Sequence, residues 1–309
     1  MLANFFGKSK PINFIVLLLV FVCAFFLNTF QTFSTEDLTL LFMIKKIVFF
    51  LVSTLLLFGV NFVVSKNKLT LGNSYALLFY LLVISFFSTY LYDNQVIFEY
   101  FIHLLFLRKI YSLQTLKEVF KKLFDAGFWL GVMCLLNPFL IVFFLFIIIA
   151  LIVHKLVRFQ TVLISVIGFL IPVFLFFTYS FWIDALPLFT NKFLMYTTYD
   201  FSVYKEIRLL APLLILSVFL LFAIFMKTGS TLSVSNRFRK NWVLLLIHLF
   251  ISISYLFFTF NRDGSELLIA AFPVAVILAN GFESIQRQLL KEIGLILFVV
   301  CALFGSLLL

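Results

Sequence analysis

Residues 73–155 read NSYALLFYLLVISFFSTYLYDNQVIFEYFIHLLFLRKIYSLQTLKEVFKKLFDAGFWLGVMCLLNPFLIVFFLFIIIALIVHK. A long apolar run ends at a polar corner around Asp93, and a shorter apolar segment that carries Glu99 and His103 follows. A basic connection, a second short segment, a break at Asn137-Pro138 and another apolar run complete the stretch. Apolar runs of this length, separated by short polar connections, are typical of helices that cross a membrane repeatedly.

The composition of the whole chain indicates the same class. Of its 309 residues, 64% are hydrophobic and only 12% are charged, whereas a soluble domain is about 45–50% apolar. The net charge of +10 is spread over many short connections, so we expect the lipid bilayer as a partner and no nucleic acid. Cys23, Cys134 and Cys301 lie inside apolar segments without metal-ligand spacing, and the sequence predicts no metal site and no cofactor.

Eleven segments are predicted to be membrane helices. They form a single transmembrane domain over residues 1–309 with no soluble domain, and the fold class is an all-α integral membrane bundle of about 11 helices. Several of the segments are shorter than the roughly 17–25 residues of an ordinary span, so they must use flanking residues or lie within the bundle. The eleven segments are residues 12–30, 47–64, 73–91, 95–107, 123–136, 138–153, 161–177, 209–226, 242–260, 267–280 and 293–309.

The distribution of basic residues predicts the orientation. With the N-terminus in the cytoplasm and all eleven segments crossing, 17 of the 23 basic residues fall on the cytoplasmic side, as the positive-inside rule requires. Acidic residues show the opposite asymmetry, which suggests a polar function for the outer face. The acids on the predicted outer side are Glu36, Asp37, Asp93, Asp184, Asp200, Glu206, Asp263 and Glu266.

Glu99 and His103 stand four residues apart in an apolar segment, so they share one face of a helix. Ionisable groups inside a membrane are costly and usually point into a bundle or a cavity. One interpretation is therefore a polar site at the outer end of the bundle. The alternative is that the two side chains satisfy each other and fix helix packing.

Glu36 and Asp37 are adjacent carboxylates in the first outer loop. Such a pair can act as a general base. The alternative is a structural one, because Ser34 followed by Asp37 matches a helix-capping pattern and acids favour the first turn of a helix. We treat Glu36 and Asp37 as the candidate catalytic residues and keep the capping alternative open.

The remaining candidates are charged groups near the predicted outer surface. Lys45 and Lys46 can meet an anionic headgroup or can extend to the interface without a partner. In the turn that contains Arg262, an acid or Ser265 can cap the next helix, while the arginine can bind phosphate. We predict an outward-opening polar cavity whose substrate-binding residues come from Lys45, Lys46, Asp93, Glu99, His103, Arg208, Arg262, Asp263 and Glu266.

Asp125 is a charged residue near the predicted cytoplasmic edge. It follows Lys121 and Lys122 by four and three residues, so the sequence predicts ordinary ion pairs on one helix surface.

The order of features in residues 73–155 resembles the membrane module of GT-C glycosyltransferases. The similar parts are the polar corner at Asp93, the segment that ends in Leu107-Arg108-Lys109, the Asp125-Ala-Gly-Phe-Trp-Leu-Gly helix and the Asn137-Pro138 break. The resemblance implies a GT-C-like helix arrangement, a polyprenyl-phosphate lipid as a partner on the outer face, and a catalytic carboxylate where this chain has Glu36 and Asp37.

Over its full length, the chain also resembles a family of small multi-pass inner-membrane proteins of Bacteroidota that has no assigned activity. The residues that carry this resemblance are Phe-Asp-Ala-Gly-Phe-Trp near 124–129 and Ser265-Glu266-Leu267. It implies a bacterial inner-membrane location, with the N-terminus cytoplasmic and the C-terminus periplasmic.

Three functions follow as hypotheses. The first is the binding or transfer of a lipid-linked glycan in cell-envelope assembly. The second is a non-catalytic membrane subunit of a larger envelope complex, with other membrane or envelope proteins as partners, which the short first outer loop favours. The third, a small-solute transporter, is the weakest, because broken helices in two repeated halves are not visible. The sequence leaves open whether the protein is an enzyme.

The predicted orientation can be tested with reporter fusions. A periplasmic reporter fused after Leu309 should be active and one inserted in the connection 237–240 should be inactive, because the basic residues of that connection hold it in the cytoplasm. A reporter that works only in the cytoplasm should give the reverse pattern. A cytoplasmic C-terminus would show that the count of eleven spans is wrong.

Overall fold

The computed structural model describes residues 1–33, 39–87, 94–194, 200–230, 235–259 and 262–308. Every regular element in these residues is a helix, and no strand occurs among them, so the all-α prediction is confirmed. The chain divides into two compact units, which are described separately below. Unit 1 comprises Met1–Phe98, Ser202–Val234 and Ala271–Leu309, and unit 2 comprises Glu99–Phe201 and Ser235–Ala270.

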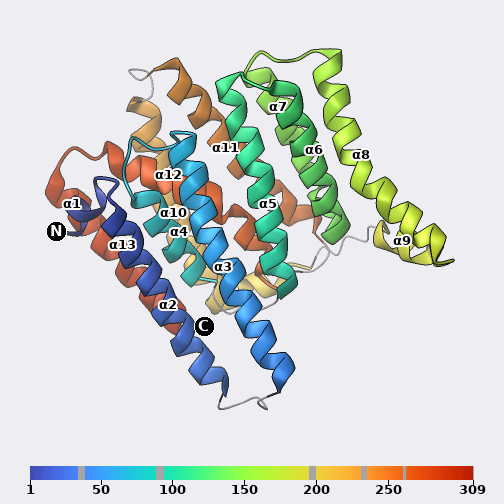
Figure 1. The fold of residues 1–309 in the computed structure, drawn as a ribbon. Coiled ribbons are helices and arrows are strands. Elements are labelled where there is room, and N and C mark those ends of the chain that lie inside the picture. Colours follow the sequence, from blue (N-terminus) through green and yellow to red (C-terminus); the bar gives the residue numbers. More distant parts are fainter. Residues whose placement is uncertain (34–38, 88–93, 195–199, 231–234, 260–261, 309) are drawn as a thin grey trace. The chain divides into compact units, whose positions relative to one another are not determined.

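Unit 1 is built around one buried helix, α12 (Ala271–Ser284), which packs against α4 and α10 (Figure 1). Its first eleven residues contain no charged residue, and all of them are buried. Gly281 lets α10 approach closely, because a Cβ atom there would lie only 2.3 Å from the Cβ of Ala223. The other helices of unit 1 are α1 (Leu2–Phe6), α2 (Pro11–Phe33), α3 (Leu40–Lys66), α4 (Tyr75–Ser85), α10 (Ile207–Ser230) and α13 (Gln288–Leu308).

Unit 2 contains the helices of Glu99–Phe201 and of Ser235–Ala270. In this unit, the short helix η2 lies between α5 and α6, and the short helix η3 precedes α7. The elements are α5 (Asn94–Ser112, in unit 2 from Glu99), η2 (Leu113–Thr115), α6 (Val119–Leu136), η3 (Pro138–Phe143), α7 (Phe144–Val153), α8 (Phe159–Trp182), α9 (Leu186–Lys192), α11 (Asn236–Phe258) and η6 (Ser265–Ala270).

Helices α6 and α8 make the closest helix–helix contact of unit 2. Gly127 on α6 faces the Ser165 carbonyl, and Gly168 on α8 faces the Phe124 carbonyl; a Cβ atom would lie 2.1 Å from the first oxygen and 2.3 Å from the second. No side chain fits at these separations, so only glycine allows the two backbones to meet. Small residues that bring backbones together are the usual means of helix association in membranes, where lipid provides no hydrophobic driving force.

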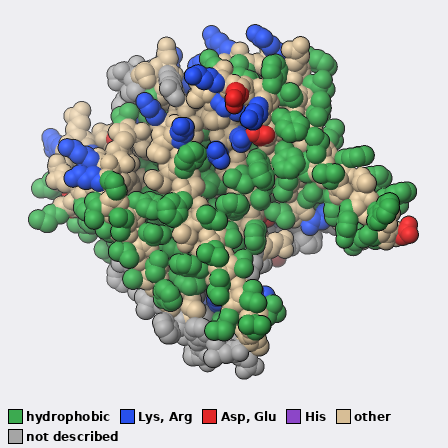
Figure 2. Space-filling view, in the orientation of Figure 1, with side chains coloured by type: hydrophobic (Ala, Val, Ile, Leu, Met, Phe, Trp, Pro, Cys, Tyr) green, Lys and Arg blue, Asp and Glu red, His purple; other side chains and the backbone are tan. Residues whose placement is uncertain are grey.

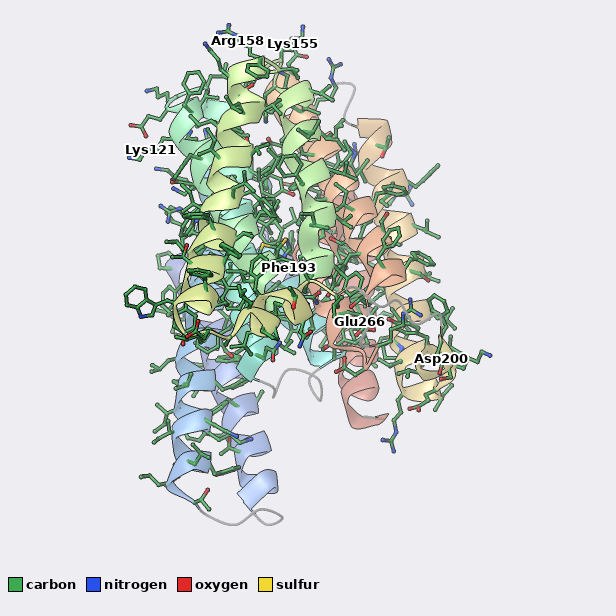
Figure 3. All side chains as sticks on the ribbon, turned by 90° about the vertical axis from the view of Figure 1, so that its right-hand side faces the viewer. Lys121, Lys155, Arg158, Phe193, Asp200 and Glu266 are labelled. Atoms are coloured by element: carbon green, nitrogen blue, oxygen red, sulfur yellow. The ribbon has the colours of Figure 1, made fainter. Side chains whose placement is uncertain are left out.

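Several basic residues of unit 2 gather at one end. Figure 3 places Lys121, Lys155 and Arg158 at this end, and Glu266 and Asp200 lie well away from it. Basic side chains also cluster over the α5–α6 and α7–α8 connections in Figure 2, while apolar side chains cover most of the visible surface. Unit 2 therefore has a basic end, and its opposite end, which carries Glu266, is called the acidic end below.

The helices correspond to the predicted segments. Among the described residues, five helices are long and apolar enough to cross a membrane: Leu40–Lys66, Phe159–Trp182, Ile207–Gly229, Phe238–Phe258 and Ser265–Ser284. Each of the eleven predicted segments has residues in a helix, but how many of them cross the membrane stays a prediction. The short segments 95–107 and 123–136 use flanking residues, which was one of the expected alternatives. Helix α5 has 19 residues and α6 has 18, because both helices continue through flanking charged residues. At 1.5 Å per residue, each is about as long as the hydrocarbon layer is thick.

The α6–α8 contact gives a direct test of the fold. Replacing Gly127 or Gly168 by Leu should lower the free energy of unfolding by about 1–3 kcal/mol or more, because the new side chain pushes the two backbones apart. Unfolding followed by circular dichroism in mixed micelles measures the change. The matched control is Gly229→Ala, since that helical glycine has no atom within 4 Å of an added Cβ. Equal stability of the Leu variants and the control would contradict the contact.

Candidate functional site

A cluster of polar side chains lies inside unit 2 near its acidic end. The Asn137 amide, which follows the last residue of α6, donates to the Tyr255 hydroxyl at 2.7 Å, and the Glu99 carboxylate lies close enough to the same amide to interact with it. The Tyr255 hydroxyl, on α11, also meets the Thr259 hydroxyl at 3.5 Å. We name Glu99, Asn137, Tyr255 and Thr259 the polar cluster. It joins α5, α6 and α11 through groups that offer both hydrogen-bond donors and acceptors.

The Asn137-Pro138 break positions this cluster. The Asn137 side-chain oxygen accepts from the Phe139 backbone at 3.2 Å and so caps η3. Proline suits the first position of the next helix because its missing N–H needs no partner there. The cap occupies the amide oxygen and leaves the amide N–H groups for Tyr255 and Glu99.

A second buried group lies further along α5. His103 and His248 have ring centroids 5.5 Å apart, and the Tyr111 hydroxyl lies 3.0 Å from Nδ1 of His248. Phe143 and Phe146 pack against these imidazole rings and separate them from solvent. Among the described residues, Nε2 of His103 has no hydrogen-bond partner.

The predicted mutual pairing of Glu99 and His103 is not what the structure describes. Glu99 lies close to the Asn137 amide, and His103 packs against aromatic rings and His248, so the two side chains have different neighbours. Both nevertheless turn toward neighbouring helices of unit 2, since His103 is buried and Glu99 is half-buried. The prediction that they share one face of a helix therefore agrees with α5.

The turn before η6 and the first turn of η6 hold three predicted site residues, Arg262, Asp263 and Glu266. Arg262 is buried: it donates to the Asp200 carbonyl at 3.2 Å and to the Phe257 carbonyl at 3.0 Å, and its guanidinium lies 4.0 Å from the Phe201 ring centroid. Within the part of the chain that the structure describes, no carboxylate forms an ion pair with this arginine. The cation is thus held by neutral acceptors.

The two acids of this turn have local structural roles, as the capping alternative predicted. Asp263 accepts from the Ser265 backbone at 2.9 Å and from its hydroxyl at 2.6 Å, and Glu266 accepts from the Gly264 backbone at 2.9 Å. Desolvation raises the pKa of Asp263, but the hydrogen bonds from Ser265 outweigh it and hold the pKa below its ordinary value. Asp263 is therefore ionised at neutral pH and supports the start of η6.

The other predicted site residues lie in unit 1 or outside the described residues. On α3, Lys45 is exposed and Lys46 lies 5.2 Å from the Phe42 ring centroid, and Arg208 is exposed in the first turn of α10. Glu36, Asp37 and Asp93 fall outside the residues that the structure describes.

Helix α3 begins at Leu40, and Thr39 is its N-cap, with its hydroxyl accepting from the Phe42 backbone at 3.2 Å. Because Glu36 and Asp37 lie outside the described residues, the catalytic and the capping interpretations of this pair both stay predictions.

The predicted ion pairs of Asp125 with Lys121 and Lys122 are wrong. Asp125 pairs instead with Lys109 of α5, at 2.6 Å, because the basic end of α5 lies beside the start of α6. Lys122 donates to the Ser112 carbonyl at 2.9 Å and to the Thr115 hydroxyl at 2.6 Å.

The sequence analysis missed five polar residues on α11 and at its C-cap: Asn241, His248, Ser252, Tyr255 and Thr259. They are separated by seven, four, three and four residues, which places them on one face of a helix. This spacing is the signal that could have found them. They include the partners of Asn137 and Tyr111.

Long apolar helices that enclose hydrogen-bonded ionisable groups define an all-helical membrane protein with a buried polar site. Residues 1–306 match DUF6427, a family of unknown function, and the chain belongs to this family. The chain matches no curated protein and no solved structure.

The Asn137–Tyr255 bond gives a test of the polar cluster that needs no assay of function. Tyr255→Phe should lower the free energy of unfolding, because it leaves a buried amide N–H without an acceptor, at a cost of about 1–3 kcal/mol. A double-mutant cycle with Asn137→Ala should show a coupling energy of about 0.5–1.7 kcal/mol, the range found for hydrogen bonds within membranes.

Ser254→Ala is the control for this cycle, because that hydroxyl on α11 bonds only the Phe250 carbonyl of its own helix. It should change stability by less than about 0.5 kcal/mol. Additive effects of the Asn137 and Tyr255 substitutions would show that the two side chains do not interact.

Proposed function

We propose that this protein is a multi-pass protein of the bacterial inner membrane that binds a lipid-linked glycan during cell-envelope assembly. The observation that carries the proposal is the polar cluster, in which a carboxylate, an amide and a phenol from three helices meet inside unit 2. Ionisable residues are rare within apolar helices because they are costly there, and they usually mark binding or transfer sites.

The chemistry of the polar cluster suits a sugar. Hydroxyl groups of a glycan both donate and accept hydrogen bonds, and Glu99, Asn137 and Tyr255 together offer both kinds of group. The surrounding apolar helices suit a polyprenyl chain. In this proposal the lipid phosphate meets Arg262, a cation of the same unit.

A GT-C-like helix arrangement and glycan transfer are the finer part of the proposal. They are supported by the sequence features of residues 73–155 and by the adjacent carboxylates Glu36 and Asp37. Either acid is then the proposed base that accepts a proton from the glycan acceptor.

A specific observation favours the second candidate function, a non-catalytic subunit of an envelope complex. Two donors of Arg262 are already occupied by backbone carbonyls, and Asp263 is used as a cap. In that case a partner protein binds at the acidic end of unit 2. The polar cluster then has a structural role and fixes the register of the unit 2 helices.

The proposal predicts that a polyprenyl-phosphate lipid copurifies with the protein from its native membrane in mild detergent. Mass spectrometry should detect this lipid in the wild-type preparation. Glu99→Gln should retain about tenfold less, because the change removes a hydrogen bond to a charged group that contributes roughly 1.5 kcal/mol. Asp184→Asn is the control: Asp184 is an exposed acid with φ of 53°, a conformation that asparagine tolerates.

The same preparation separates the candidate functions. Copurification of a stable protein complex without polyprenyl lipid supports the subunit, and absence of the lipid from wild type overturns glycan binding. Transfer is tested by the double variant Glu36→Gln, Asp37→Asn in a deletion strain. If that variant accumulates in the membrane and complements fully, transfer is excluded and binding alone remains.

A further inference from the structure

An open groove of about 360 Å³ lies between α5 and α6 at the basic end of unit 2. Arg108, Lys109 and Asp125 form its polar part. The groove lies toward the opposite end of unit 2 from the polar cluster, so it is independent of the function proposed above.

The wall of the groove changes in character along the helices. Arg108 and Lys109 lie in the last two turns of α5, near the basic connection to α6. Phe124, Phe128 and Trp129 line the groove from α6, and the last two lie about one turn deeper in that helix than Asp125. The groove is therefore charged at its mouth and apolar and aromatic along its length.

The charge at the mouth is positive. Asp125 neutralises one cation, because its carboxylate lies 2.6 Å from Lys109. Arg108 adds a second positive charge on the groove, and Lys122 lies close enough to Lys109 and Glu118 to interact with both electrostatically. The basic side chains that gather over the same connection in Figure 2 extend this field beyond the groove.

We infer that this groove binds an anionic phospholipid, with its phosphate at Arg108 and one acyl chain along Phe124, Phe128 and Trp129. Charge complementarity supports this occupant over a zwitterionic lipid, since basic pockets beside membrane helices attract anionic headgroups. The guanidinium of Arg108 can donate two parallel hydrogen bonds to one phosphate group. The apolar wall explains why the ligand is a lipid and not a free phosphate.

Trp129 reports directly on the occupant of the groove. The chain has 3 tryptophans, and the double substitution Trp182→Phe, Trp242→Phe leaves Trp129 as the only one. Trp182 is 85% exposed, and the buried indole N–H of Trp242 has no hydrogen-bond partner among the described residues, so both changes are mild. The full-length variant is placed in vesicles that contain phosphatidylglycerol or phosphatidylcholine with brominated acyl chains, which quench nearby tryptophan.

At equal fractions of brominated lipid, brominated phosphatidylglycerol should quench Trp129 with an apparent association constant about fivefold higher than that of brominated phosphatidylcholine. Arg108→Gln should remove this preference. Arg158→Gln, which removes a cation at the same end of unit 2 but outside the groove, should retain it. Circular dichroism checks that each variant keeps its helical content.

Each other outcome overturns the inference. Equal quenching by both lipids would show a groove filled by bulk lipid without selection of charge. Equal loss of preference in Arg108→Gln and Arg158→Gln would assign the effect to the general surface field. No quenching by either lipid would show that protein, and not lipid, covers Trp129.

Discussion

A polar side chain enclosed by apolar helices has no water to bond with, and this constraint decides which helix faces meet in unit 2. Each unsatisfied polar group there costs several kcal/mol, so the polar faces of α5 and α11 must turn inward. Asn137 mediates between them, because its amide donates to the Tyr255 hydroxyl and lies close to the Glu99 carboxylate. If any of the three were turned toward lipid, its partners would lose their bonds as well. The polar cluster thus fixes the rotation of three helices about their axes.

Glycine adds a constraint on distance. At Gly127 and Gly168 the α6 and α8 backbones approach so closely that no Cβ atom fits. This contact holds the body of α6, while Asn137 at its end is held by hydrogen bonds. Position and rotation of α6 are therefore set by different interactions, one apolar along its length and one polar at its end, and both are needed to place the Asn137 amide.

Periodicity and apolar length were sufficient to predict the helices, but not the partners of their polar residues. The all-α class, the shared face of Glu99 and His103 and the capping role of Asp263 follow from local sequence. The Asn137–Tyr255 bond joins residues 118 positions apart, and no local pattern indicates which helices will be neighbours. The same limit explains the error at Asp125: helical spacing offered Lys121 and Lys122, but tertiary packing brought Lys109 closer. Helices α5 and α6 extend beyond their apolar runs, because charged residues that end an apolar run do not end a helix.

The two ends of unit 2 differ in how far their charged side chains are already engaged by neighbouring groups. This difference affects which ligand each end can bind. At the acidic end, the Asp263 and Glu266 carboxylates accept bonds from neighbouring backbone groups, so these acids are already used. At the basic end, Asp125 pairs with Lys109, one of the two cations that line the groove. A ligand at the acidic end must therefore compete with existing hydrogen bonds, which favours a polyhydroxyl group that can replace them one for one. A ligand at the basic end meets an excess of positive charge on the groove, which favours an anionic headgroup. In the two proposals above, hydrogen-bond geometry selects a glycan at one end of unit 2 and charge selects an anionic lipid at the other.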